Sequence, residues 1–373
     1  MTTAMADPIP EEPALRVLAP DGQLDAASDP GLPAEQLLRV FRELVRLRMV
    51  DARLTALHRQ GRIGPHLSSL GQEVAPVVVG LVSRAGDWVF PALRESGVML
   101  VRGFGLERYL AQVFGSRGDV LKGRQAPGHM SSRDANLASW SSCVGTQLTH
   151  AVGVAWAARQ RRDSTVSIAF LGDGATSAPD FHAAMNFAAV FQVPCVFICQ
   201  NNQYAASTPT QRQTAASSIA VKGRAYAVGA HRVDGNDALA MYQAVSDALA
   251  TSRRGGGPVL IESVTYRLAS HSTSDDPTRY RPQAEWEHWA QADPLRRLQT
   301  YLRGRGLLSD SSVTEMENAI TAEIDRAVVA AESEGPPDRA TLFDDVVQGL
   351  PWHLAEQRDE LLRHPPVGTF RLA

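Results

Sequence analysis

The chain has 373 residues, with 37 Lys and Arg against 40 Asp and Glu, and a formal net charge of −3. A charge so close to zero argues against a protein that binds nucleic acid by neutralising many phosphates. Apolar residues make up 44% and charged residues 21%, which is ordinary for a soluble globular protein and excludes a wholly disordered chain. The length predicts two domains, or one large α/β domain with extensions.

The cysteines and the apolar segments indicate a cytoplasmic protein. Cys143, Cys195 and Cys199 have neither the spacing of a zinc site nor the even count of a disulfide framework, which fits a reducing cytosol. The first residues lack the basic segment and apolar core of a secretory signal. The most apolar stretch, residues 187–199, is interrupted by a glutamine and a proline and is too short to span a membrane.

The N-terminal third begins without periodicity and then becomes helical. Residues 1–33 are rich in Pro, Asp and Ala, so we expect an extended arm, either a disordered tail, which the sequence favours, or a strap over a partner subunit. From Pro33, apolar residues recur at three- and four-residue steps, which predicts an amphipathic helix ending near Gly61. A second, buried helix is predicted over residues 72–82.

Strand and helix patterns alternate through the middle of the chain. The predicted strands are 87–90, 165–171, 195–200, 230–233 and 259–265, and the predicted helices are 149–161, 180–191 and 238–253. Such alternation is typical of an α/β fold with a mostly parallel central sheet and helices on both faces. We therefore expect an α/β domain over residues 34–284. A helical C-terminal region should follow over residues 285–373, with helices at 295–302 and 311–334.

Two of the predicted strands run directly into unusual polar residues. Gly172-Asp173-Gly174 follows one strand, and Asn201-Asn202 follows the next. Ligands of open α/β sheets bind beyond the carboxyl ends of the strands, so both groups should face one crevice if the strands are neighbours. Carboxylate, amide and carbonyl oxygens suit Mg²⁺ or Ca²⁺, and glycines let the backbone approach a phosphate. Each motif alone could be a plain turn or polar loop, but the pair indicates a metal–diphosphate site.

The spacing of the two motifs resembles the thiamine diphosphate fingerprint, in which GDG is followed at this distance by NN. A Rossmann dinucleotide site is matched less well, because Ser177 stands where its fingerprint has a third glycine.

Segments outside the fingerprint are similar to the alpha subunit of branched-chain 2-oxo acid dehydrogenases. The similarity runs from about residue 16 to about residue 364. The segments that carry it are RQGRIG (59–64), FPALRESGVMLVRG (90–103), GRQAPGH (123–129), NNQYAASTPT (201–210), VDGND (233–237) and YRLASHSTSDDPTRYR (266–281). GRQxPxH and HSTSDD are the specific parts, since pyruvate dehydrogenase alpha subunits usually differ at both. The resemblance implies a thiamine-diphosphate-binding fold. It also implies oxidative decarboxylation of branched-chain 2-oxo acids, with acyl transfer to a lipoyl group.

Carried over residue by residue, the resemblance implies sites for Mg²⁺ and for the diphosphate. The implied Mg²⁺ ligands are the side chains of Asp173 and Asn202 and the carbonyl of Tyr204. The implied diphosphate contacts are Gly172, Asp173, Gly174, Ala175 and Asn202, with Arg94 and Arg267 as cations. In two departures, Leu93 stands where a tyrosine is common in the family, and Gln200 stands where some members have a basic residue.

At the other end of the cofactor, the resemblance places Ser142 and Val144 against the aminopyrimidine and the catalytic His271 beside the reactive thiazolium carbon. From the residues alone, His271 could also be a core or a surface-loop histidine, although its polar neighbours disfavour the core. A histidine that titrates near neutrality suits proton transfer during acyl transfer. Some family members hold a structural K⁺ at the positions of Ser141, Cys143, Thr146 and Gln147. Cys143 departs from the usual residue there.

The resemblance also implies partners, because ylide formation needs a carboxylate that this chain does not offer. In the family that glutamate belongs to the beta subunit, so we expect an α₂β₂ heterotetramer. The other implied partners are a small 2-oxo acid substrate and the lipoyl-bearing acyltransferase component, with no nucleic acid and no membrane.

Residues 272–277 could be a solvated turn with Asp276 as a helix cap. The family uses this segment as a mobile loop, and animal members are phosphorylated there. We expect its order to depend on the cofactor, and a phosphate at Ser272 to disfavour lipoyl docking. Two alternatives stay open: a pyruvate or acetoin dehydrogenase alpha subunit with the same site, and a Mg-diphosphate-binding structural subunit without chemistry.

Overall fold

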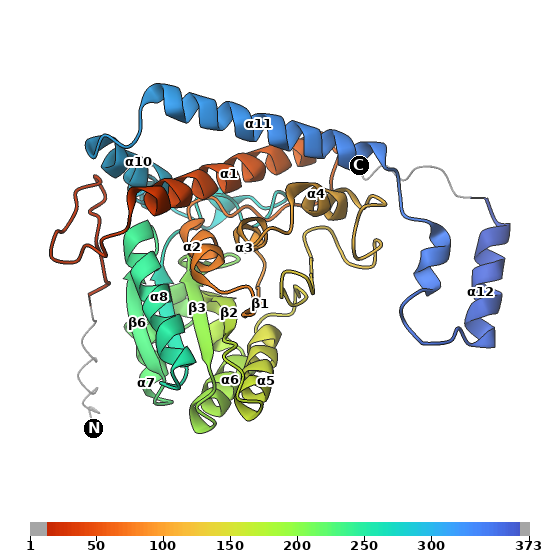
Figure 1. Cartoon of the computed structure of the whole chain (residues 1–373), viewed down its shortest axis with the longest axis horizontal. Helices are drawn as coiled ribbons and strands as arrows, with labels where there is room; N and C mark the ends of the chain where they lie inside the picture. The colour runs from red at the N-terminus through yellow and green to blue at the C-terminus, as the bar shows by residue number, and fades with distance from the viewer. Residues whose placement is uncertain (1–12, 366–373) are drawn as a thin grey trace.

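The computed structural model describes residues 13–365, which fold around a five-stranded sheet (Figure 1). The strands lie in the order β1-β2-β3-β7-β6, and every neighbouring pair is parallel. Their bounds are β1 Trp88–Phe90, β2 Ser167–Gly172, β3 Cys195–Asn201, β6 Gly229–Asp234 and β7 Val259–Val264. All five predicted strands are confirmed with small shifts at their ends, because parallel strands buried on both faces carry continuous apolar runs.

Helices cover both faces of the sheet, as the sequence predicted. On one face lie α5 (Thr146–Gln160), α6 (Pro179–Val190) and α7 (Ala220–Arg224), and on the other lie α2 (Val74–Val82), α3 (Ser96–Val101) and α8 (Ala238–Arg253). Alternate strand residues separate the two cores. Ile168 and Phe170 belong to the core beneath α2 and α8, whereas Ala169 and Leu171 belong to the core beneath α5 and α6.

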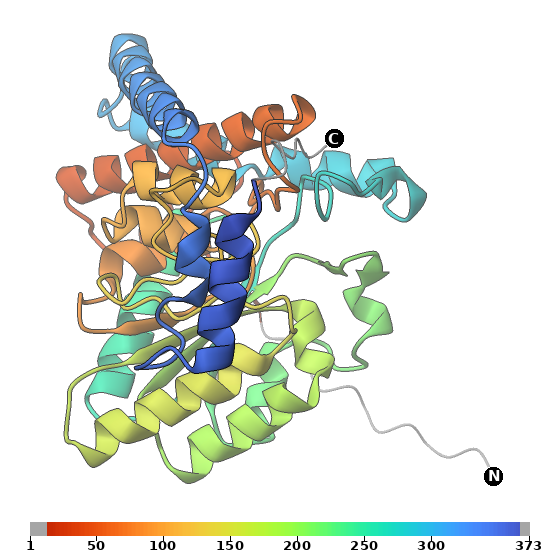
Figure 2. The same cartoon turned by 90° about the vertical axis from the view of Figure 1, so that its right-hand side faces the viewer.

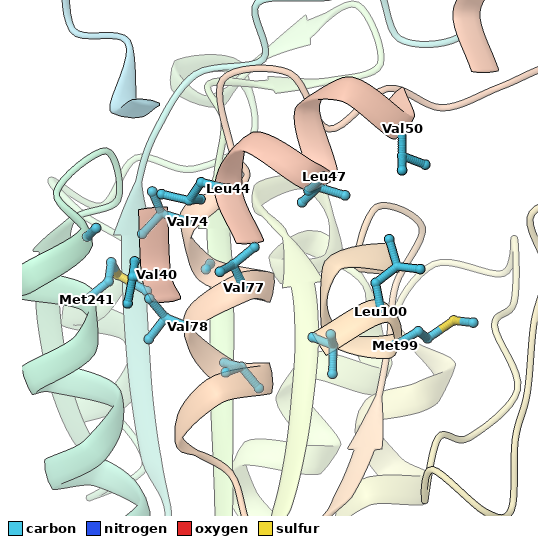
Figure 3. Close-up of a cluster of buried hydrophobic side chains, with 14 of the residues drawn as sticks. Val40, Leu44, Leu47, Val50, Val74, Val77, Val78, Met99, Leu100 and Met241 are labelled. Carbon is cyan, nitrogen blue, oxygen red and sulfur yellow. The ribbon is translucent and has the colours of Figure 1, made fainter. Parts of the chain in front are cut away.

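The long helix α1 (Ala34–Arg59) confirms the amphipathic pattern that follows Pro33. Figure 3 shows Leu44 and Leu47 of α1 above Val77 of α2 and Leu100 of α3. Each of these four side chains is at most 5% exposed. Burying one such side chain stabilises the fold by about 1.5–3 kcal/mol, so α1 closes the larger of the two cores.

The C-terminal region is helical. Its helices are α9 (Gln283–Gln291), α10 (Pro294–Gly304), α11 (Asp310–Ser333) and α12 (Trp352–Arg363). Figure 1 shows α11 running along α1 and over α4 (Leu106–Phe114), and it packs against both. The boundaries predicted after residues 33 and 284 stay predictions.

Residues 338–365 form a separate feature that we call the C-terminal hairpin. It consists of the 3₁₀ helix η4 (Arg339–Phe343), a loop and α12, and neither helix contains a buried residue. The hairpin stands beside the body at the right of Figure 1 and nearest the viewer in Figure 2. One tether is an ion pair of 2.5 Å between Lys122 Nζ and Asp345 Oδ2. The chain breaks before the hairpin at Gly335, which has a φ of +68°.

The N-terminal arm corrects one expectation. Residues 1–12 lie outside the described residues, but residues 13–33 are not a disordered tail. Leu15 donates from its N–H to the Arg232 carbonyl at 2.8 Å and forms a parallel bridge with Val233. Val17 and Leu18 are fully buried. The sequence could not reveal that β6 lies at the edge of the sheet, where its unpaired backbone groups accept the arm. Among the described residues, no helix is long and apolar enough to cross a membrane.

Candidate active site

A cavity of about 540 Å³, the sheet-edge cavity, opens at the carboxyl ends of β2 and β3. Of all the site residues predicted from the sequence, only Thr146 is missing from its wall. The predicted residues on the wall are Arg94, Ser141, Ser142, Cys143, Val144, Gln147, Gly172, Asp173, Gly174, Ala175, Asn202, Tyr204, Arg267 and His271. A larger hollow of about 1070 Å³ beneath the C-terminal hairpin contains none of them.

The sheet register brings the two fingerprint motifs together. Gly172 pairs with Gln200 on the neighbouring strand, so the GDG and NN turns leave the sheet at the same edge. Asp173 begins the 3₁₀ helix η1 (Asp173–Ser177) and is 2% exposed. Its Oδ2 accepts hydrogen bonds of 2.9 Å from Thr210 Oγ1 and Gln213 Nε2. Burial raises the pKa of this carboxyl, a shift that a nearby cation would oppose.

The NN turn reverses the chain at once. After Asn202, the short strand β4 (Tyr204–Ala205) pairs antiparallel with β5 (Thr208–Pro209), which leads into the 3₁₀ helix η2 (Thr210–Arg212). Gln203 and Ala206 have φ angles of +73° and +49°, in the left-handed region that non-glycine residues rarely adopt. The Tyr204 N–H donates to Asn202 Oδ1 at 3.3 Å. The turn therefore holds the Asn202 amide oxygen against the backbone of Tyr204.

The two glycines of the GDG turn differ in what they require. A Cβ on Gly174 would lie 2.5 Å from the Ala205 Cβ, so only glycine lets the GDG turn approach β4. A Cβ on Gly172 would meet no atom within 4 Å. Packing against β4 therefore requires glycine at position 174. Beside Gly172, in contrast, the fold leaves open space.

Two buried arginines flank the cavity without a direct ion pair in the part of the chain that the structure describes. Arg94 is 8% exposed and Arg267 is 2% exposed, and neither forms an ion pair with a carboxylate among residues 13–365. Arg267 instead donates to the carbonyls of Tyr204 at 3.0 Å and Ala206 at 2.7 Å. Burial, followed by repulsion from Arg267, lowers the pKa of Arg94 to about 10. An anion bound between the two arginines would relieve both costs.

His271 lies against Arg94. The Arg94 Nη2 donates to the His271 carbonyl at 2.6 Å and lies 3.4 Å from His271 Nδ1. Since a guanidinium can only donate, Nδ1 acts as the acceptor and the ring proton sits on Nε2. Burial, then Arg94 and Arg267, lower the pKa of His271 to about 4. The expectation that His271 titrates near neutrality is therefore wrong for this structure, because the sequence did not reveal the two adjacent cations.

The loop that carries His271 is held at several points. Asp275 Oδ2 accepts from the His271 N–H at 2.8 Å and from the Tyr280 hydroxyl at 2.5 Å. Thr273 and His66 are joined by two hydrogen bonds of 3.0 Å. Asp276 caps the 3₁₀ helix η3 (Pro277–Arg279), which confirms the expected cap. The segment containing Ser272 is therefore an organised loop on the rim of the site.

Residues 141–145 form a turn that leads into α5, whose first two residues are Thr146 and Gln147. Thr146 Oγ1 donates to the Cys143 carbonyl at 3.3 Å, and the Cys143 N–H donates to Ser141 Oγ at 3.1 Å. Gln147 points elsewhere and donates from Nε2 to the Phe170 carbonyl at 2.8 Å. Ser142 Oγ lies 2.6 Å from Nε2 of His129, the last residue of the GRQAPGH segment. Val144 is 60% exposed at the mouth of the cavity.

Sequence reasoning missed two polar side chains of the wall, Gln72 and Glu95. Glu95 accepts hydrogen bonds from the N–H groups of Ala92 at 2.8 Å and Arg94 at 3.0 Å, and from Gln200 Nε2 at 2.7 Å. Burial raises the pKa of Glu95 to about 7. Their contacts join segments far apart in the chain, so no local pattern marks them. The nearest signal was Gln200, already singled out as a departure.

The parallel sheet, and the cavity at its carboxyl edge where the GDG and NN turns meet, are consistent with the thiamine-diphosphate-binding fold that the resemblance implied. The sequence matches the family described as the dehydrogenase E1 component over residues 42–339. The chain therefore belongs to this family, and within it to the alpha subunits of branched-chain 2-oxo acid dehydrogenases, as the resemblance predicted.

Three relatives illustrate the similarity. The 3-methyl-2-oxobutanoate dehydrogenase subunit alpha of Mycobacterium tuberculosis is 41% identical over 355 residues, covering 94% of each chain. The 2-oxoisovalerate dehydrogenase subunit alpha 2 of Arabidopsis thaliana is 39% identical over 359 residues, covering 95% of this chain and 76% of the relative. The human 2-oxoisovalerate dehydrogenase subunit alpha is 37% identical over 354 residues, covering 94% and 80%. The chain is accordingly a thiamine-diphosphate-dependent oxidoreductase subunit, and the non-enzyme alternative is not supported.

Proposed function

We propose that this chain is the catalytic alpha subunit for oxidative decarboxylation of branched-chain 2-oxo acids, with acyl transfer to the lipoyl group of an acyltransferase component. The observation that carries the proposal is the sheet-edge cavity, where the GDG turn, the NN turn, two arginines and His271 meet. The relatives named above support the branched-chain substrate class.

The cavity fits thiamine diphosphate held through Mg²⁺. Residues 13–365 contain no cluster of three His, Cys, Asp or Glu side chains for a metal, so this ion needs amide and carbonyl oxygens as well. Asp173, Asn202 and the Tyr204 carbonyl would supply one ligand each. The carbonyl has a second lone pair beside its bond to Arg267. Gly172, Gly174 and Ala175 would lie against the diphosphate, and Arg94 and Arg267 would neutralise it. When bound, the cofactor supplies the electron sink for decarboxylation.

His271 would act as a neutral hydrogen-bond donor at the reacting centre. Its Nδ1 is turned toward Arg94, so Nε2–H is the end free for substrate. Binding a diphosphate would offset the two arginines that hold the imidazole uncharged, and this would raise its proton affinity for the acyl-transfer step. Ser142 and Val144, at the cavity mouth, would contact the aminopyrimidine.

A partner subunit would complete this site. Asp173 and Glu95 are the carboxylates on the cavity wall, and hydrogen bonds within the chain engage both. Neither is left for the aminopyrimidine, so the activating glutamate would come from a beta subunit in an α₂β₂ heterotetramer. The outer surface of α5 and α6 exposes Trp156 by 44%, Phe187 by 54% and Val190 by 67%, as a protein interface would.

Two further parts of the proposal concern K⁺ and location. Ser141, Cys143 and Thr146 share one turn and would hold a structural K⁺ with the side chain of Gln147, once that amide presents its oxygen.

We place the protein in the cytoplasm on the basis of its three free thiols.

The test is to co-express the chain with its beta subunit and measure initial rates on 3-methyl-2-oxobutanoate and pyruvate with an artificial electron acceptor. We expect thiamine diphosphate and Mg²⁺ to be required and the branched substrate to give the higher kcat/KM. A higher value for pyruvate would overturn the substrate class.

Two substitutions test the assigned roles within the assembled enzyme. Asp173→Ala removes the carboxylate proposed as a metal ligand, so cofactor binding should weaken by roughly a hundredfold or more. His271→Ala should keep cofactor binding and assembly but slow acyl transfer to the lipoyl group by about a hundredfold. Unchanged acyl transfer in His271→Ala would remove this residue from the mechanism.

A further inference from the structure

Three buried polar atoms on the wall of the sheet-edge cavity have no hydrogen-bond partner within residues 13–365. They are Gln72 Nε2, Gln200 Oε1 and Arg267 Nε. Gln72 is 2% exposed and Gln200 is 3% exposed, so bulk solvent does not satisfy them. Buried polar groups are almost always paired, and an unpaired one in a cavity wall points to a ligand.

The orientation of Gln72 follows from a donor that cannot rotate. The Tyr204 backbone N–H donates to Asn202 Oδ1 at 3.3 Å, which fixes the oxygen side of the Asn202 amide. Asn202 Nδ2 must then face Gln72 and donates to its Oε1 at 3.0 Å. Gln72 therefore accepts with Oε1, and its Nε2 has no partner among residues 13–365 although the side chain lines the cavity.

The two ends of the Gln72 amide thus have different roles: Oε1 accepts from Asn202, and Nε2 is a donor without a partner among the described residues. If its amide were reversed, Nε2 would donate to Asn202 and compete for the oxygen that the proposed metal needs. With Oε1 toward Asn202, that oxygen is left to the Tyr204 N–H and the metal. The local fold anchors Gln72 for this purpose, since its own N–H donates to the Ser69 carbonyl at 2.9 Å just before α2.

We propose that Gln72 is a positioning residue of the cofactor site: it holds Asn202 with its amide oxygen toward the metal, and it offers its free N–H to an oxygen of the metal–diphosphate group. This role rests on the proposed function. The hydrogen bond spans 130 residues of sequence, so only the folded sheet edge reveals it.

The test compares two substitutions at this position in the assembled enzyme. Gln72→Glu keeps an acceptor for Asn202 but removes the N–H donor, whereas Gln72→Met removes both. Isothermal titration calorimetry would give the dissociation constant of Mg²⁺ at saturating thiamine diphosphate, and that of thiamine diphosphate at saturating Mg²⁺. We expect Gln72→Glu to weaken thiamine diphosphate about tenfold and Mg²⁺ little, and Gln72→Met to weaken both about tenfold.

Gln112→Met is the matched control, because Gln112 is 1% exposed and hydrogen-bonded to backbone carbonyls outside the sheet-edge cavity. It should lower the melting temperature without changing either constant. If both Gln72 variants lost thermal stability but kept the wild-type constants, Gln72 would be purely structural and the inference wrong. If the wild-type enzyme itself bound no Mg²⁺ and thiamine diphosphate, the proposed function would fail first.

Discussion

At the carboxyl edge of the sheet, Gln72, Gln200 and Arg267 each have one buried polar atom without a partner among residues 13–365. In the C-terminal hairpin the opposite is found, since Leu342 is 56%, Val346 67% and Trp352 78% exposed. One region has polar groups where water cannot reach them, and the other has apolar groups where water can.

The difference indicates what each region is built to meet. Unpaired donors and acceptors in a concave wall are satisfied by a small polar ligand, here an anion with its metal. Exposed apolar side chains on a convex feature are satisfied by another protein surface. The sheet-edge cavity therefore lacks a polar ligand, and the C-terminal hairpin lacks an apolar surface to pack against.

The largest effect is expected from neutralising Glu95, one of the two buried carboxylates on the cavity wall. The pKa of Glu95 is about 7 in the fold against an ordinary 4.5, so the folded chain holds its proton more tightly than the unfolded chain. Wild-type stability should therefore fall, relative to Glu95→Gln, as pH rises from about 4.5 to 7. The total difference should be on the order of 3 kcal/mol and stay constant above that range.

Glu95→Gln can be accommodated, because Gln200 has a free Oε1 that can turn to accept the new amide. Urea unfolding from pH 5 to 8 would measure the effect. Glu107→Gln, on the exposed surface of α4, is the control and should show no such difference. A pH-independent gap between wild type and Glu95→Gln would mean that Glu95 is not held protonated by burial.

On the hairpin side, Trp352→Ser should weaken assembly with the partner subunit by about tenfold, as loss of an aromatic interface contact does. Because this side chain is 78% exposed, the melting temperature of the unassembled chain should hardly change. Gln357→Ser, also exposed on α12 but on another side of the helix, is the matched control. Equal assembly constants for Trp352→Ser and wild type would show that the hairpin is not an interface.

The sequence predicts some helices well and misses others, depending on whether a regular apolar pattern marks them. Helix α8 was predicted with its observed bounds, because its apolar period is regular and Asp237 caps it. Helix α3, with the sequence SGVMLV, was missed because it is short and apolar on most sides, so it has no period to detect. Helix α12 was missed because it buries no residue in the described chain.

The residues of the candidate site also fall into those that a local pattern marks and those that only the fold brings together. The GDG and NN motifs were found because each is local, and the family resemblance supplied the roles of Arg94 and His271. Gln72 and Glu95 were missed because their contacts to Asn202 and Gln200 span 130 and 105 residues. The lowered pKa of His271 was missed for the same reason, since only the fold brings two arginines to its side.

The smallest effect concerns backbone strain, which occurs both at the site and elsewhere in the fold. Ala206 has a φ of +49°, and its carbonyl accepts from Arg267 at 2.7 Å, so the NN turn holds a non-glycine residue in a left-handed conformation. Ala206→Gly should raise the free energy of unfolding by roughly 1 kcal/mol, because glycine adopts this conformation without the Cβ clash. Arg162→Gly, at φ +54° just beyond α5, should give a similar gain. Urea unfolding would measure both gains in stability.

Calorimetry would measure the dissociation constant of Mg²⁺ in the same two variants. If strain at Ala206 serves the site, Ala206→Gly alone should weaken Mg²⁺ binding, since the released turn no longer fixes the Tyr204 carbonyl. Identical Mg²⁺ constants in the two variants would make the strain incidental.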